Sequence, residues 1–185
     1  WLFGFLQNPD DPIRPWLKIR MPSFGFDGNK ADILVNYFAG LSEVKIPYVH
    51  VDEAKVPAGY LEAGRQLFSD DYFECGSCHQ QGDKKPDGAM EDWAPDLNMA
   101  RQRLNPDWIE KWILDPQKLQ PGTKMPSFYP GGPEDILGGD EKKQIEALTD
   151  YIMLLGLKPT DAAKAGGGLA TEPGREGTAG TDKQG

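Results

Sequence analysis

Apolar residues recur every three or four positions in several parts of this chain, a spacing that predicts amphipathic helices. Such patterns occupy residues 33–41, 60–68 and 145–155. No segment alternates apolar and polar residues as a half-buried strand would. The pattern therefore predicts an all-α protein.

Two of the predicted helices have recognisable ends. Asn105-Pro106 is typical of a helix start, because an Asn side chain caps free backbone N–H groups and proline suits the first helical position. This helix is predicted to stop at Asp115-Pro116. Another helix is predicted to begin after Asp140 and to run to Gly156.

The chain also contains an internal repeat. Residues 1–9 align with residues 108–116, and after a loop each is followed by the same tetrapeptide, Met-Pro-Ser-Phe, at 21–24 and at 125–128. An apolar helical pattern then closes each copy. The spacings differ by short insertions in the loops, where insertions are tolerated. A shared tetrapeptide inside a shared order of elements indicates a genuine repeat.

This repeat suggests how the chain is organised. Residues 1–44 are interpreted as the second half of a domain whose complete copy spans 58–158. The polar, proline-bounded segment 45–57 is the predicted linker. Residues 159–185 are rich in glycine, with Leu169 as their one large apolar residue, so we expect a flexible tail.

Composition and charge narrow the classes of partner. Hydrophobic residues make up 38% of the 185 positions, and the formal net charge is −9. An acidic surface repels phosphate backbones, so we expect no nucleic-acid partner and favour a protein with a basic docking surface. The longest apolar runs are too short to span a bilayer, so no transmembrane segment is expected.

The chemistry is carried by Cys75 and Cys78, the chain's two cysteines, and by His79, which follows them directly. Thiols three residues apart share one face of a helical turn, so both can reach the two vinyl groups at one edge of a porphyrin. The adjacent imidazole can then ligate the iron. This C-x-x-C-H spacing is the attachment signature of haem c.

Three other interpretations of the motif stay open at this point. A zinc site would need four ligands, and no second pair of cysteines completes it. A thioredoxin-like redox pair is expected in a βαβ setting, which the pattern does not predict. A pair of unremarkable free thiols leaves the adjacent histidine unexplained. Covalent haem c explains all three residues.

With this motif the chain resembles the class I c-type cytochromes, fully over 58–158 and in its second half over 1–44. The resemblance implies a class I cytochrome c fold preceded by the C-terminal half of a second cytochrome c-like domain. In that family a first helix with a Gly-x-x-x-Phe pattern crosses a last helix that carries an aromatic residue. Residues 64–68 and Tyr151 match this arrangement.

The resemblance also implies further site residues. The family's distal methionine lies on a loop before the last helix, where Met125 stands, with Met90 and Met99 as weaker candidates. Pro95 matches the proline whose carbonyl accepts the N–H of the iron-ligating histidine. The remaining cofactor-binding candidates, which could donate to the haem propionates or simply be surface arginines and a core tryptophan, are Arg101, Arg103 and Trp108.

Met21 occupies the place of a distal ligand in the half-copy, yet the chain holds no second attachment motif. Missing upstream sequence, loss of a haem, or a complementary half from elsewhere would each explain this. We expect the first, which would make the parent protein a tandem, two-haem cytochrome. The chain as written is expected to carry one covalent haem c.

Ligation by His79 and Met125 would leave iron without an open position, which favours one-electron transfer over catalysis. The resemblance implies a periplasmic location, or the outer face of the cytoplasmic membrane. It further implies a subunit or arm of a membrane respiratory complex, of the quinol:cytochrome c reductase or oxidase type. Two alternatives remain: a peroxidase-like haem enzyme with an open or labile sixth position, and an interaction domain.

Overall fold

The computed structural model describes residues 1–9, 15–43 and 55–157. Within these ranges the chain is helical, and the only β-type pairings are two isolated bridges, His79 with Ala94 and Gln81 with Lys84. The all-α prediction is confirmed for this part of the chain. The predicted tail, 159–185, and most of the predicted linker, 45–57, lie outside the described residues.

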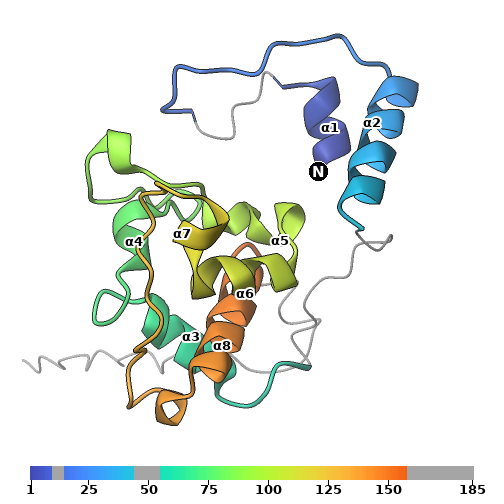
Figure 1. Ribbon diagram of the computed structural model, residues 1–185. Coiled ribbons are helices and arrows are strands. Elements are labelled where there is room, and N and C mark those ends of the chain that lie inside the picture. Colours follow the sequence, from blue (N-terminus) through green and yellow to red (C-terminus); the bar gives the residue numbers. More distant parts are fainter. Residues whose placement is uncertain (10–14, 44–54, 158–185) are drawn as a thin grey trace, which may run out of the picture.

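The helices follow one another from the blue to the orange end of the ribbon in Figure 1. Short 3-10 turns lie between some of them, at Met90–Asp92, Leu97–Met99 and Leu137–Gly139. The α-helices are α1 (Leu2–Gln7), α2 (Gly28–Leu41), α3 (Tyr60–Phe68), α4 (Cys75–Cys78), α5 (Ala100–Arg103), α6 (Pro106–Leu114), α7 (Pro116–Leu119) and α8 (Glu141–Leu154). None of the helices among the described residues has the length and apolar character needed to cross a membrane.

The predicted helix starts are present. The Asn105 side chain accepts a hydrogen bond from the backbone N–H of Asp107 at the start of α6. Asp140 accepts one from the backbone N–H of Lys143 at the start of α8. The α8 helix ends at Leu154, slightly before the expected end at Gly156.

Helices α3 and α8 cross at Gly64, and the crossing requires a glycine. A Cβ atom there would lie 2.3 Å from the carbonyl oxygen of Ala147 and 2.7 Å from Cβ of Tyr151. Phe68 then packs edge-on against Tyr151, with ring centroids 5.4 Å apart. The predicted crossing of a Gly-x-x-x-Phe helix with an aromatic-bearing last helix is therefore present.

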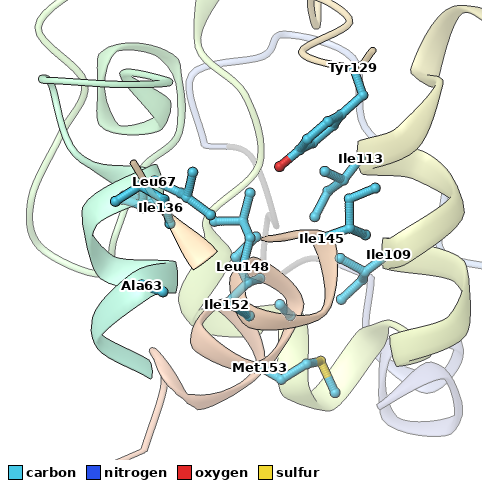
Figure 2. Close-up of a cluster of buried hydrophobic side chains, with 13 residues drawn as sticks. Ala63, Leu67, Ile109, Ile113, Tyr129, Ile136, Ile145, Leu148, Ile152 and Met153 are labelled. Atoms are coloured by element: carbon cyan, nitrogen blue, oxygen red, sulfur yellow. The ribbon is translucent and has the colours of Figure 1, made fainter. Parts of the chain in front are cut away.

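Side chains from α3, α6 and α8 converge on one hydrophobic core, which Figure 2 shows in close-up. Leu67, Ile113 and Leu148 are fully buried there. The one buried amide in this region, Gln144, is satisfied, because its Nε2 donates to the carbonyl oxygens of Pro133 and Ile136 at 2.7 and 2.8 Å. This core fixes α6 and α8, and the segment between these two helices contains α7 and the loop that carries Met125.

The N-terminal helices α1 and α2 pack against each other and bury Leu6 and Ala31. Trp1, just before α1, and Trp16, between α1 and α2, contact later parts of the described chain. The guanidinium carbon of Arg103 lies 4.4 Å from the centroid of the Trp1 ring. Trp16 meets Trp93 edge-on, with centroids 5.4 Å apart.

The two copies of the sequence repeat share several features of local geometry. Trp1 stacks on Phe5 with centroids 5.0 Å apart, and Trp108 stacks on Trp112 at 5.1 Å. Leu6 and Ile113 are both buried, as are the prolines that follow them, Pro9 and Pro116. Asp27 caps α2 by accepting from the backbone N–H of Lys30, as Asp140 does for α8.

Candidate functional site

The two cysteines lie on the single turn of α4. Both are free thiols, Cys75 half-buried and Cys78 exposed. Burial raises the pKa of Cys75 to about 12, so this group is a neutral thiol at physiological pH. The described residues also contain no βαβ unit, which is the usual setting of a thioredoxin-like pair.

His79 is held by the segment that faces it. Its Nδ1 lies 2.9 Å from the carbonyl oxygen of Pro95, and the backbone N–H of Ala94 donates to the carbonyl of Cys78 at 2.8 Å. Because a carbonyl can only accept, Nδ1 carries the proton and the lone pair of the imidazole lies on Nε2. Burial lowers the pKa of His79, and the bond to Pro95 opposes this shift. A neutral, oriented imidazole is the form that binds a metal.

Met125 lies on a loop that α7 ties down. Nε2 of Gln117 donates to the carbonyl oxygens of Thr123 and Met125 at 2.7 and 3.1 Å. The backbone N–H of Gly122, whose φ is +82°, donates back to the amide oxygen of Gln117. The Met125 sulfur accepts a hydrogen bond from the indole Nε1 of Trp112 at 2.8 Å.

Contacts on both sides of these groups bring the α4 region and the Met125 loop together. Phe73, which precedes α4, stacks on Phe128 with centroids 4.4 Å apart. Lys124 forms an ion pair with Asp92 at 2.6 Å. Figure 1 shows the segment after α7 running past α4. The thiols, the imidazole and the thioether therefore belong to one region of the fold.

The other predicted residues are more dispersed. Arg101 is half-buried on α5, and Arg103 lies against Trp1. Trp108 is 42% exposed and stacks on Trp112. Of the weaker methionine candidates, Met90 is exposed and Met99 is half-buried.

Sequence reasoning missed Gln117 and the sulfur contact of Trp112. No motif marks Gln117, since its role depends on the path of the following loop. Trp112 follows Trp108 by four residues and so shares a face of α6 with it. That spacing predicts that the two rings stack, but not that the indole N–H of Trp112 meets Met125.

The side chains present suit an iron porphyrin better than a bare metal ion. Among the described residues, no group of three or more His, Cys, Asp or Glu side chains is placed to hold a metal. The donor set is two thiols, one imidazole and one thioether. Two thiols that can bond to a porphyrin edge and an adjacent imidazole for its iron fit haem c, whereas a zinc site needs four protein ligands or an open water position.

Comparison with known proteins places the chain in a family. A profile described as Cytochrome c matches residues 61–156, which is more than half of the 185 residues. Searches of the curated proteins and of the solved structures returned no match. On the strength of the profile match, supported by the helical fold and the donor set, the chain belongs to the cytochrome c family, which carries covalent haem c and transfers electrons.

Proposed function

We propose that residues 58–158 hold one haem c and act as a one-electron carrier. Cys75 and Cys78 form the thioether bonds, and His79 and Met125 are the axial ligands. When bound, haem c supplies a reversible change of iron oxidation state. The observation that carries the proposal is the bond from His79 Nδ1 to the Pro95 carbonyl, because it directs the free lone pair of Nε2 to a metal beside the two thiols.

The residues around the ligands hold them in place. The Pro95 carbonyl fixes the ring of His79 and makes its Nε2 a stronger donor. Gln117 restrains the backbone at Met125. With both axial positions filled by protein side chains, no position is left for a substrate, and this supports a carrier over a peroxidase-like enzyme.

Arg101, Arg103 and Trp108 are proposed to donate to the haem propionates. Arg101 and Arg103 lie on α5, and Trp108 lies on the neighbouring helix α6. Loss of one of these donors should lower the stability of the holoprotein without altering the axial ligands or the covalent attachment.

The test is haem content together with the spectrum of the oxidised holoprotein. One haem per 58–158 domain by pyridine haemochrome absorbance, with a near-infrared Met-to-iron charge-transfer band, is the expected result. Met125→Ala should abolish the band and retain the haem. Absence of haem would contradict the proposal and would mean that Cys75 and Cys78 act as free thiols. High-spin spectra with rapid peroxide turnover would support the peroxidase-like enzyme instead.

The proposed location is the periplasm or the outer face of the cytoplasmic membrane, as an arm of a respiratory complex of the quinol:cytochrome c reductase or oxidase type. Haem c is attached outside the cytoplasm in the family that the chain resembles. The net charge of −9 supports docking to a basic redox partner. Co-purification of the chain with membrane redox subunits from the native source tests this, and recovery as a free soluble protein would contradict it.

A second proposal concerns residues 1–44, as the C-terminal half of a second cytochrome c-like domain in which Met21 ligates a second haem. The support is the repeated local geometry: stacked aromatic pairs at the start of α1 and α6, matching buried residues, and matching Asp caps on α2 and α8. The segment before α2 repeats the Met-Pro-Ser-Phe sequence that contains Met125.

The exposure of α2 agrees with this proposal. We align Tyr37 of α2 with Tyr151 of α8. In this alignment the side chains of Ile33, Tyr37 and Leu41 correspond to the face of α8 that packs against α3 at the helix crossing. In α2 these three side chains are 59%, 62% and 69% exposed. Ala31, which faces α1, is fully buried. Among the described residues, α2 is therefore covered on the side of Ala31 and exposed on the side of Ile33, Tyr37 and Leu41, as expected for a half-domain.

Haem stoichiometry on protein from the native source tests the second proposal. Because Cys75 and Cys78 are the chain's only cysteines, a second covalent haem needs an attachment motif outside these 185 residues. The proposal would be supported if the protein contains two haems and if Met21→Ala removes the Met-to-iron band of one of them. A single haem whose spectrum is unchanged in Met21→Ala would overturn it and leave 1–44 as a docking element.

A further inference from the structure

The segment that faces His79 is fixed by the rest of the fold. Leu97 packs against the hydrophobic core, and Asn98 lies against Gly156, two residues beyond the end of α8. This approach is so close that a Cβ atom on Gly156 would lie 2.1 Å from the carbonyl oxygen of Asn98. Residues 94–98 therefore have a fixed position from which they can orient the histidine.

The chain after His79 forms a tight turn. The backbone groups of Gln81 and Lys84 exchange two hydrogen bonds, of 3.0 and 3.1 Å, and Gly82 has a φ of +61°. A Cβ atom on Gly82 would lie 2.6 Å from the side-chain nitrogen of Asn98. The turn therefore packs directly on the segment that faces the histidine.

The carboxylate of Asp96 joins these two segments. Its Oδ1 accepts the backbone N–H of Gly82 at 2.9 Å and that of Asn98 at 2.9 Å. The first bond reaches across to the turn, and the second caps the 3-10 helix Leu97–Met99. Hydrogen bonds to an ionised acceptor are stronger than those between neutral groups. Asp96 therefore holds the turn after His79 against the fixed segment.

Pro95 depends on its neighbours for support, because proline has no backbone N–H to donate. Its carbonyl oxygen lies 2.9 Å from Nδ1 of His79. Backbone hydrogen bonds from Ala94 and Leu97 tie the residues around it to the segment that contains the histidine, at 2.8 and 2.9 Å. The Asp96 carboxylate supplies a third connection, directly after the proline.

We infer that Asp96 is a positioning residue that holds the Pro95 carbonyl on Nδ1 of His79 and thereby lowers the reduction potential of the haem. This inference rests on the proposed ligation of iron by His79. A group that accepts the N–H of a ligating histidine fixes the ring and raises the basicity of the other nitrogen. Asp96 acts on the histidine through Pro95.

The direction of the effect follows from the charge on the iron. A firm hydrogen bond to the Pro95 carbonyl gives the imidazole of His79 more negative charge, which stabilises the oxidised, more positive iron. If the bond loosens, the oxidised form loses stability relative to the reduced form, and the potential rises. Removal of the negative charge of Asp96 would also raise the potential, so a test has to distinguish hydrogen bonding from charge.

Two substitutions at the same position make this distinction. Asp96→Asn removes the charge and keeps a side-chain oxygen that can accept both backbone N–H groups. Asp96→Ala removes the charge and the acceptor together. The difference between the two variants therefore measures the positioning effect alone.

The experiment uses holoprotein expressed as the full chain. It measures the reduction potential and, in the reduced, diamagnetic state with ¹⁵N-histidine labelling, the exchange rate of the His79 Nδ1–H. Relative to Asp96→Asn, Asp96→Ala should shift the redox equilibrium toward the reduced form by about twofold to fivefold, or about 20–40 mV for one electron. Its Nδ1–H should exchange faster, whereas Asp96→Asn should exchange like the wild type.

Asp140 offers a matched control for the loss of a cap. Its side chain caps α8 in the same way, by accepting the backbone N–H of Lys143. Asp140→Ala should be less stable to unfolding than Asp140→Asn, because only the alanine variant loses the cap. The two Asp140 variants should have equal potentials and equal exchange rates at His79. A merely structural role for Asp96 would give this same pattern.

The outcomes separate the inference from the proposal on which it rests. A wild-type holoprotein whose His79 ring protons lack the upfield shift of an iron ligand beneath a porphyrin would mean that the proposed ligation fails. With that shift present, equal potentials and equal Nδ1–H exchange in Asp96→Ala and Asp96→Asn would overturn the inference alone. A potential difference of the same size between the two Asp140 variants would also overturn it.

A measurement on the wild type decides the case if Asp96→Ala does not fold. The backbone N–H of Gly82 and the Nδ1–H of His79 should be released by the same local opening. After correction for intrinsic rates, their exchange should therefore give one opening free energy. A Gly82 N–H that exchanges freely while the Nδ1–H stays protected would overturn the inference.

Discussion

At the scale of single residues, the Met125 loop depends on one amide side chain. Gln117 makes three hydrogen bonds to the backbone of residues 122–125. Gln117→Ala removes all three, and we expect a loss of about 1–3 kcal/mol in the free energy of unfolding. We also expect the Met-to-iron band to disappear at lower temperature than in the wild type. Thermal melts followed at that band provide the measurement.

The matched control lies in the same loop. Gln120 is exposed, and Gln120→Ala should leave both the melt and the band within experimental error of the wild type. A loop that tolerates both substitutions equally would show that Gln117 does not hold Met125.

Asp150 provides a residue-scale prediction about pH. Burial, and then the carboxylates of Glu110 and Glu146, raise its pKa from 3.8 to about 6. The folded protein therefore keeps this proton up to about pH 6, whereas the unfolded chain releases it near pH 4. The stability that this group contributes is fully present below pH 4 and is lost as the pH rises through 6.

Asp150→Asn removes this ionisation. We expect the variant to be more stable than the wild type at pH 7.5, by about 1 kcal/mol after allowance for solvent screening of a half-buried group. At pH 4 the difference should vanish. Denaturant titrations at the two pH values measure the free energy of unfolding of both proteins. Asp71 is exposed, so Asp71→Asn serves as a control that should leave the free energy of unfolding unchanged at either pH. An equal gain in stability for Asp150→Asn at both pH values would contradict a raised pKa for Asp150.

At the scale of elements, the crossing of α3 and α8 is the least tolerant contact in the fold. Gly64→Ala would place a methyl group against the backbone of α8, at 2.3 Å from the Ala147 oxygen. Backbone cannot move aside without separating the helices, so we expect a loss of at least about 3 kcal/mol, or failure to fold.

Gly40→Ala is the control for the intrinsic effect of the substitution. Gly40 also lies inside a helix, α2, and nothing lies within 4 Å of a Cβ atom placed there. Because alanine favours helix more than glycine does, this variant should gain up to about 1 kcal/mol. In thermal unfolding we expect Gly64→Ala to lower the stability of the protein and Gly40→Ala to raise it. Similar changes would mean that the crossing is looser than the structure indicates.

The helices also show which parts of the fold can be predicted from the sequence. The starts of α6 and α8 were predictable, because a cap and the first turn are adjacent in the chain. The single turns α5 and α7 were not, since four residues are too few to show a helical period. Tertiary contacts, which leave no local pattern, determine whether such short turns form.

The same division applies to the candidate site. Cys75, Cys78 and His79 stand out because their chemistry depends on spacing within one turn. The 2.8 Å contact between Trp112 and Met125 depends on how α7 and its loop return toward α6, and no spacing rule encodes that path. Pro95 was identified only through resemblance to a family, since a proline sixteen residues after a histidine carries no signal of its own.

At the scale of the whole molecule, net charge leads to a prediction about the rate of docking. The chain carries 29 acidic and 20 basic residues, excluding histidine, which gives the net charge of −9. Exposed charges of this kind raise the rate of encounter with an oppositely charged protein and act over roughly 10 Å at moderate ionic strength.

We therefore expect electron exchange with a basic redox protein to slow as salt is added. Exchange with an acidic redox protein should start slower and quicken with salt, because screening then removes a repulsion. Stopped-flow rates at increasing sodium chloride, with the two partners matched in reduction potential, distinguish these cases. Two rates that are equally insensitive to salt would mean that the acidic surface does not steer docking.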